Sequence, residues 1–193
     1  MARPSNKEEK AELILDAFER CIAKVGVEGA TLKLVAEEAS MARALLRHHV
    51  GNREDLIDAM VQRFLQRSSA LNQELLAYLP SENRVPALLE VLFSPENLQY
   101  SNDILVAEAL INAAQTRPEL SDKLLPWYQE FELIITDELA CEYNASNKED
   151  IEIVATGIVG IYFNVYSITG LGQVEKMLRL SQGACRKLIS TLE

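Results

Sequence analysis

The sequence predicts an all-α fold, and three observations support that prediction. Apolar residues recur at three- and four-residue steps along most of the chain, which is the spacing that places them on one face of a helix. Turn signals such as "PSENRVP", "TRPEL" and "NASNKED" separate these stretches, and no convincing strand pattern occurs. The chain has 193 residues, of which 48% are hydrophobic, so it can form a substantial core.

Three helices are expected at the start of the chain. Apolar residues from Ala11 to Val25 share one stripe of a first helix, which should bury that face and end at Gly26. Thr31 can cap a short second helix, because its side-chain oxygen can accept a hydrogen bond from a free backbone N–H. A third short helix runs through "ARALLRHH" and stops at Gly51.

A long fourth helix and several later ones follow. Asn52 can cap the fourth helix, Asp55 is placed to strengthen that cap, and Pro80 closes the helix. The stretch "IVATGIVGIYFNVYSI" contains many β-branched residues, but it is too long for a strand and follows a cap at Asn147. We therefore predict a buried helix over residues 148–171.

Charge divides the chain into two regions. Residues 1–67 contain 11 Lys and Arg and 11 Asp and Glu, whereas the remainder contains 8 and 18, so the whole net charge of −10 lies after residue 67. Such a split indicates two modules with different partners.

The three cysteines bear on the cellular compartment. Cys21, Cys141 and Cys185 are too far apart for a metal or redox motif, which favours a reducing cytoplasm. The sequence contains no signal-peptide run and no stretch of about 18 apolar residues. We therefore expect a cytoplasmic protein without a membrane segment.

The stretch "MARALLRHHVGNRED", residues 41–55, places Arg43, Arg47 and two adjacent histidines on one short helix of an otherwise acidic chain. Three short helices followed by a long one, with a tight turn between the second and third, form the layout of a helix-turn-helix motif. The segment from Ile14 to Leu56, "ILDAFERCIAKVGVEGATLKLVAEEASMARALLRHHVGNREDL", resembles the N-terminal domain of the TetR family of bacterial transcriptional repressors. It follows that family's "KxG" end of the first helix, "IAxxAGVS" turn and "LYxHFxxKExL" exit.

The resemblance implies a division into two domains. Residues 1–52 would form a three-helix helix-turn-helix DNA-binding domain, and the long helix would join it to a helical ligand-binding and dimerisation domain over residues 53–193. It further implies a homodimer that binds a double-stranded DNA operator and responds to a small-molecule effector, with no cofactor.

The chemistry of the third helix suits DNA contacts. The guanidinium of Arg43 can bond two acceptors of one guanine, and Leu45 can offer methyl groups to a thymine. Thr31 can hold a phosphate at a helix N-terminus, where backbone N–H groups favour anions, and Arg53 is placed to do the same for the fourth helix. The predicted DNA contacts are Thr31, Lys33, Ala42, Arg43, Leu45, Arg47, His48 and Arg53.

Other interpretations of these residues remain open. Arginines on an exposed helix face often only solvate it, and neighbouring histidines point about 100° apart on a helix, so they cannot chelate one metal ion together. We therefore predict no metal site. Ser40 replaces the family's turn glycine, at a cost of about 1 kcal/mol if φ is positive there. Ala42 replaces the Ser that caps the recognition helix, a loss of about 1 kcal/mol. These departures predict an unusual DNA preference.

The apolar helix over residues 148–171 is the expected dimer interface. Gly157 and Gly160 thin one of its faces for the close approach of another helix. The resemblance implies that this helix and the next, "GLGQVEKMLRLSQGACRKLIS", pair with their copies, which sets two recognition helices about 34–36 Å apart for successive major grooves. The predicted interface residues are Ile158, Ile161, Val165 and Ile168.

An effector pocket is expected around the segment "RPELSDKLLPWYQEFELIITDEL". Pro118 suits a helix start, and Pro126 can kink or break the helix and so open space beside the aromatic residues. Because Glu108 is the only expected charge, the predicted ligand is mainly apolar or aromatic, with a cation as an open alternative. Equally, the aromatic side chains could simply fill the core. The predicted ligand contacts are Tyr100, Glu108, Asn112, Trp127, Tyr128, Phe131, Tyr162, Asn164 and Tyr166.

The sequence contains no Gly-rich phosphate loop, nucleophile elbow or metal-binding His-x-x-x-His, so we predict no enzyme activity. The expected function is that of a ligand-responsive, homodimeric DNA-binding repressor, released from its operator by a small, mainly apolar molecule. The alternative is a helical dimer that binds a small molecule or a protein and has lost specific DNA binding.

Overall fold

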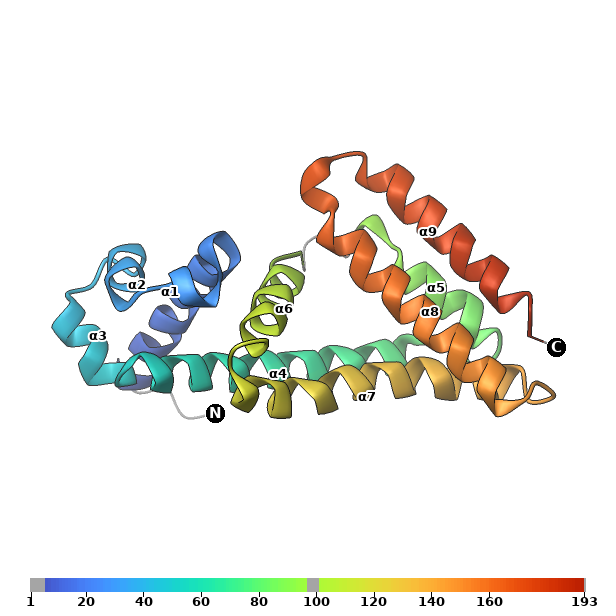
Figure 1. Ribbon diagram of the computed structural model, residues 1–193, viewed down its shortest axis with the longest axis horizontal. Coiled ribbons are helices and arrows are strands. Elements are labelled where there is room, and N and C mark those ends of the chain that lie inside the picture. The colour runs from blue at the N-terminus through green and yellow to red at the C-terminus, as the bar shows by residue number, and fades with distance from the viewer. Residues whose placement is uncertain (1–5, 97–100, 193) are drawn as a thin grey trace. The chain divides into compact units, whose positions relative to one another are not determined.

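The computed structural model describes residues 6–96 and 101–192, and in these ranges the regular secondary structure is entirely helical (Figure 1). This confirms the predicted all-α fold. The elements are α1 (Asn6–Gly29), α2 (Leu32–Glu38), α3 (Arg43–Val50), α4 (Arg53–Tyr78), α5 (Arg84–Leu92), α6 (Ser101–Ala114), α7 (Pro118–Glu142), α8 (Lys148–Ser167), the 3-10 helix η2 (Thr169–Leu171) and α9 (Val174–Ile189).

The chain forms two compact units. Unit 1 comprises Met1–Ser68 and Leu105–Ser121, and unit 2 comprises Ser69–Ile104 and Asp122–Glu193. Three helices, α4, α6 and α7, therefore contribute residues to both units. These units are defined by contacts within the chain. The predicted division by function, into residues 1–52 and 53–193, stays a prediction.

The core of unit 1 is built from the predicted stripe of α1 together with α2, α3 and the start of α4. Its fully buried side chains include Ile14, Phe18, Ile22, Val35, Leu46, Leu56 and Met60. Val25 is the exception to the predicted stripe, because its side chain is half exposed and Val27 is buried instead. Gly26 has φ 70 and ψ 172, which interrupts the helical path at that point, and α1 ends at Gly29 rather than at Gly26.

Three side-chain caps begin helices where the sequence predicts them. Thr31 Oγ1 accepts a hydrogen bond from Leu34 N at 3.2 Å, and Asn147 Oδ1 accepts one from Asp150 N at 2.9 Å. At α4 the cap is reciprocal, because Asn52 Oδ1 accepts from Asp55 N at 3.1 Å while Asn52 N donates to the Asp55 carboxylate at 2.8 Å.

The core of unit 2 lies between α5, α7, α8 and α9, and α8 packs along α9 (Figure 1). Two details differ from the predictions. The helix expected over residues 148–171 ends at Ser167 and is followed by η2, and α7 continues through Pro126 without a break. The innermost side chains of this core include Leu88, Leu89, Ile135, Leu139, Val159 and Tyr166.

Two of the four predicted interface residues also belong to this core. Ile158 and Val165 are almost fully buried by the helices of their own chain, whereas Ile161 and Ile168 are half-buried. Helical periodicity correctly indicated a buried face, but the chain itself covers that face. This corrects the expectation that Ile158 and Val165 are available to a second copy.

The cysteines are free, and they differ in exposure. Cys21 and Cys185 are buried, and Cys141 is exposed. Burial raises the pKa of the Cys185 thiol to about 12, and burial is also the main cause of the raised pKa of Cys21. Separately, none of the helices described for residues 6–96 and 101–192 is long and apolar enough to span a membrane.

Candidate nucleic-acid interface

The turn between α2 and α3 is closed by backbone hydrogen bonds around a left-handed residue. Ser40 has φ 53, so the position that carries glycine in the family has a positive φ here, which is the condition under which the replacement was expected to cost stability. Met41 N donates to Ala36 O at 2.9 Å, and Ser40 N donates to Glu37 O at 3.1 Å. These two bonds form a Schellman motif, in which glycine is the usual left-handed residue. The turn between α2 and α3 therefore forms, although Ser40 occupies the left-handed position that favours glycine.

Helix α3 turns one face to the core and the other outward. Leu46 is completely buried and anchors the helix, whereas Arg43, Arg47 and His48 are exposed. Ala42 holds the extended N-cap conformation, with φ −67 and ψ 136, but it has no side chain to cap the helix. The side-chain cap is therefore absent, as the sequence predicts, and the outward face of α3 carries residues whose DNA contacts stay a prediction.

Thr31 and Lys33 lie on the exposed surface at the start of α2. Thr31 uses its hydroxyl oxygen for the cap of that helix. Lys33 Nζ lies 3.8 Å from Glu37 Oε1, and both side chains are largely exposed. A surface pair of this kind is weak, so Lys33 can readily exchange Glu37 for another anion.

The two histidines differ in their surroundings. Their rings form an edge-to-face pair with centroids 5.3 Å apart, and His48 is exposed while His49 is half-buried. Nδ1 of His49 is buried and has no hydrogen-bond partner among the described residues. Desolvation, followed by the positive groups of His48, Lys10 and Lys7, lowers the pKa of His49. His49 is therefore a partly packed residue whose surroundings disfavour its charged form.

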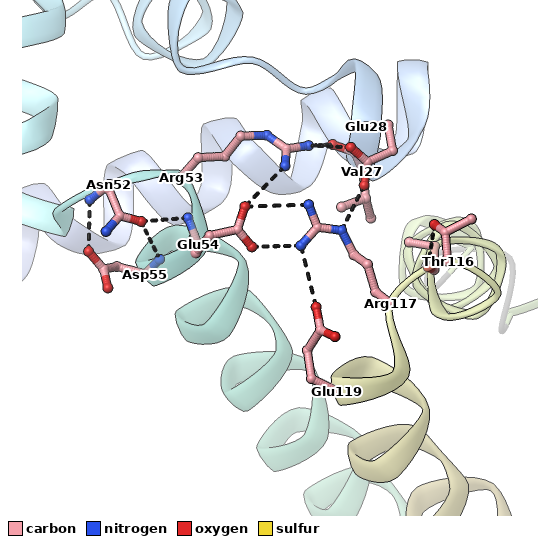
Figure 2. A network of polar contacts seen from close by, with 10 residues as sticks. Val27, Glu28, Asn52, Arg53, Glu54, Asp55, Thr116, Arg117 and Glu119 are labelled. Atoms are coloured by element: carbon pink, nitrogen blue, oxygen red, sulfur yellow. Dashed lines mark hydrogen bonds and ion pairs between the residues drawn. The ribbon is translucent and has the colours of Figure 1, made fainter.

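Arg53, at the start of α4, already has protein partners (Figure 2). Its Nη2 atom donates to Val27 O at 2.7 Å and lies 3.2 Å from Glu28 Oε2, and its Nη1 atom lies 3.5 Å from Glu54 Oε1. A DNA phosphate would have to replace these partners. The predicted phosphate contact at Arg53 therefore stays a prediction that must include this exchange.

A second arginine, Arg117, completes this cluster and was missed at the sequence level. It lies in the turn between α6 and α7, and Figure 2 shows its guanidinium facing the carboxylates of Glu28 and Glu54. Its Nε donates to Glu28 Oε1 at 2.8 Å, its Nη1 to Glu54 Oε2 at 2.6 Å, and its Nη2 to Glu54 Oε1 at 3.4 Å. These hydrogen bonds are the first cause of the lowered pKa of both glutamates. Within unit 1, Arg117 thus connects the α6–α7 turn to the end of α1 and to the start of α4.

The predicted effector contacts fall into separate places. Tyr100 lies outside the described residues, Glu108 and Asn112 belong to unit 1, and the other six belong to unit 2. Asn112 and Asn164 are exposed. Their joint role as a binding site stays a prediction.

The aromatic members in unit 2 form a contiguous cluster around Phe163. This ring stacks on Tyr128 at 5.9 Å and meets Trp127 edge-on at 5.8 Å. Tyr162 contacts Phe131, with ring centroids 5.2 Å apart, and also Tyr166, at 5.1 Å. The cluster includes two buried rings, those of Phe131 and Tyr166, and the other rings in it are half-buried.

Tyr166 occupies the buried end of that cluster. Its side chain is 1% exposed, and its hydroxyl donates to Leu92 O at 2.7 Å. Leu92 is the last residue of α5, where a carbonyl lacks a partner within the helix. Tyr166 is therefore engaged in the core, which agrees with the alternative that some of these aromatic residues fill it.

The tight turn and the exposed cationic helix behind it define a helix-turn-helix protein. The family model described as bacterial regulatory proteins of the tetR family matches residues 14–60, which span most of α1 through the start of α4. Over these residues the chain matches the TetR family.

Several known proteins are similar to this chain. The HTH-type transcriptional repressor AcnR of Corynebacterium glutamicum is 31% identical over 72 residues, which is 37% of each chain. The chain spans well under half the length of the curated relatives that it matches.

Solved structures are similar over nearly the whole chain. A TetR transcriptional regulator from Legionella pneumophila superposes with a TM-score of 0.74 at 16% identity and covers 100% of both chains. A protein from Saccharomonospora viridis, solved in complex with choline, superposes with a TM-score of 0.75 at 16% identity, over 95% of this chain and 96% of that one. At such identities the likeness shows the fold.

Proposed function

We propose that the protein is a transcriptional repressor that acts as a homodimer and leaves its operator when a small, mainly apolar molecule binds. The observation that carries this proposal is the surface of α3. Leu46 anchors the helix in the core of unit 1, and the opposite face presents Arg43, Arg47 and His48 to solvent. In a chain with a net charge of −10, an exposed cationic helix behind a tight turn suits the major groove of DNA.

The roles of the contacts follow from their positions. Arg43, the first residue of α3, makes the paired contact with a guanine, and Leu45 packs on a neighbouring thymine. Thr31 and Lys33 at the start of α2 hold phosphates and fix the orientation of the module without reading sequence. The DNA-binding domain is residues 1–52 in this proposal, and residues 53–193 form the ligand-binding and dimerisation domain.

Dimerisation through α8 and α9 is supported by apolar side chains that the chain leaves uncovered. Ile153 of α8 is 61% exposed and Leu180 of α9 is 54% exposed. Ile161 and Ile168 are half-buried and can add to the same interface. Gly157 accepts Leu188 of α9 closely, because a Cβ at Gly157 would lie 3.0 Å from the Leu188 Cδ1 atom. Two such helix pairs would form a four-helix bundle around a two-fold axis.

The effector is proposed to contact the half-buried aromatic side chains of unit 2. Trp127, Tyr128 and Tyr162 supply apolar area, and aromatic faces also attract organic cations. The Saccharomonospora viridis protein of the same fold is described as a complex with choline, which supports testing small cations beside apolar compounds. Trp127 is the only tryptophan, so its fluorescence reports binding directly. Ligands that change this fluorescence and leave DNA affinity untouched would contradict the regulatory role.

The decisive experiment measures binding to the DNA upstream of the protein's own gene in a gel-shift titration at several salt concentrations. Binding through phosphates releases counterions, so the affinity should fall steeply with salt, by a logarithmic slope of about 0.9 per contacted phosphate. Arg43→Ala should lose about 1–3 kcal/mol at one base position of each half-site. Arg179→Ala, which removes an exposed arginine from α9, is the matched control and should bind as the wild type does.

The second candidate is a helical dimer that binds a small molecule or a protein and no longer reads DNA. The positive φ of Ser40 and the missing cap at Ala42 favour it, since both weaken the turn that presents α3. This candidate predicts no salt-dependent affinity for any DNA. It also predicts that Arg43→Ala and Arg179→Ala behave alike.

A further inference from the structure

Four charged side chains meet where α1 ends and α4 begins. Arg53 and Arg117 are the two cations, and Glu28 and Glu54 are the two carboxylates (Figure 2). With both arginines in place, the charges of Glu28 and Glu54 are matched. Glu119 is a further carboxylate beside Arg117, because its Oε1 atom lies 3.6 Å from Arg117 Nη1. Without Arg117, two carboxylates would face Arg53 alone, next to the capping carboxylate of Asp55. The start of α4 would then carry net negative charge at the point where a phosphate is expected.

Arg117 is the better placed of the two cations to hold the glutamates. Its side chain is 17% exposed, and all three of its guanidinium nitrogens donate to Glu28 or Glu54. Arg53 makes longer contacts with the same carboxylates, at 3.2 and 3.5 Å, beside its bond to Val27 O. Arg53 can therefore leave the glutamates with less loss than Arg117 can.

We propose that Arg117 is a positioning residue that masks Glu28 and Glu54, so that Arg53 can exchange its carboxylate partners for a DNA phosphate. The proposal rests on the proposed DNA-binding function and adds the means of its regulation. When Arg117 is in place, it takes the shorter contacts with the glutamates, so they hold Arg53 only at 3.2 and 3.5 Å and repel a phosphate less. When Arg117 is withdrawn, they hold Arg53 and repel the phosphate more strongly.

The position of Arg117 in the chain suits a regulatory role. The residue lies in the turn between α6 and α7, far in sequence from the module that it neutralises. Helices α6 and α7 both continue from unit 1 into unit 2. An effector that changes these helices in unit 2 can therefore act on DNA affinity by moving one cation, as a coupling between two sites requires.

The test compares Arg117→Ala with a triple variant that also carries Glu28→Gln and Glu54→Gln. Arg117→Ala should weaken operator binding roughly 2- to 30-fold, the range expected for losing two partly exposed charge interactions. The triple variant should bind within about twofold of the Glu28→Gln, Glu54→Gln double variant, because the two carboxylates that Arg53 shares with Arg117 are absent from both. Arg84→Ala is the matched control, since Arg84 forms a similar two-pronged pair with Glu138 within unit 2, and its operator affinity should stay unchanged.

The outcomes distinguish two roles of Arg117, which are to neutralise Glu28 and Glu54 and merely to stabilise the local structure. If Arg117→Ala weakens binding and the glutamine substitutions do not restore it, Arg117 acts only as a structural brace and the proposal is wrong. An unchanged operator affinity of Arg117→Ala, with normal salt-dependent binding by the wild type, would overturn the proposal and leave the DNA-binding function intact. A wild type without salt-dependent binding would overturn both.

Folding of the variants is checked by thermal unfolding before each titration. If Arg117→Ala does not fold, Arg117→Lys replaces it, because lysine keeps the charge but loses the fork that spans two carboxylates. Arg117→Lys should then weaken binding in the wild-type background and have no effect in the double variant. Equal losses in both backgrounds would contradict the masking role.

Discussion

Replacing Tyr166 by phenylalanine tests whether this residue stabilises the core rather than contacting an effector. The change keeps the ring in its buried place and removes the hydroxyl that donates to Leu92 O at 2.7 Å. The carbonyl of Leu92 ends α5, so it loses the partner that satisfies it there. Leaving a buried acceptor unsatisfied costs about 1–3 kcal/mol. For a protein of this size that corresponds to a decrease in Tm of roughly 2–12 °C.

The assay is unfolding in urea followed by the fluorescence of Trp127, which lies in the same unit as Tyr166. Tyr78→Phe is the matched control, because Tyr78 is 75% exposed and its change should stay within about 0.5 kcal/mol of the wild type. If Tyr166→Phe were as stable as Tyr78→Phe, the bond to Leu92 would not contribute to stability. A variant of normal stability that no longer responded to effector would instead place Tyr166 in the binding site.

Three further predictions concern assembly, pH and the recognition helix. The double variant Ile153→Glu, Leu180→Glu should sediment as a monomer. The control Leu13→Glu changes a residue of α1 that is as exposed as Leu180, and it should leave the dimer intact. If the double variant also sedimented as a dimer, the proposed interface would be wrong. His49 has a lowered pKa in the folded state, so the unfolded chain is protonated first as the pH falls. Stability should therefore be lost from about pH 6.5 downward, and His49→Gln should show a smaller loss, measured by unfolding at each pH. Ala42→Ser should add about 1 kcal/mol to the unfolding free energy by restoring a cap, and no gain would refute the cap geometry.

The sequence predicted most reliably what depends on a few neighbouring residues. The caps at Thr31, Asn52 and Asn147 each involve a side chain and a backbone group within three residues, so their residue types and spacing are sufficient. The backbone conformation of Ser40 was left open by the sequence, and the structure shows the left-handed conformation that this type of helix end requires.

Features that depend on distant segments could not be predicted. Periodicity indicated that Ile158 and Val165 are buried, but it does not distinguish the chain's own helices from a second copy. Arg53 was assigned a phosphate on local grounds, and the Val27 carbonyl that it contacts lies in another helix. Arg117 lies beside Glu119 in the sequence, and nothing local indicates its stronger contacts with Glu28 and Glu54, which are more than 60 residues away.

Because only one of the three thiols is exposed, the chain can be labelled at a single site without any substitution. A maleimide dye or a spin label can attach at Cys141, near the end of α7, while Cys21 and Cys185 are shielded in the folded protein. In the proposed homodimer, one probe per chain gives two probes related by the symmetry of the assembly. The distance between the two probes can then be measured by spectroscopy in solution. It can be followed during effector and DNA titrations without altering a single residue.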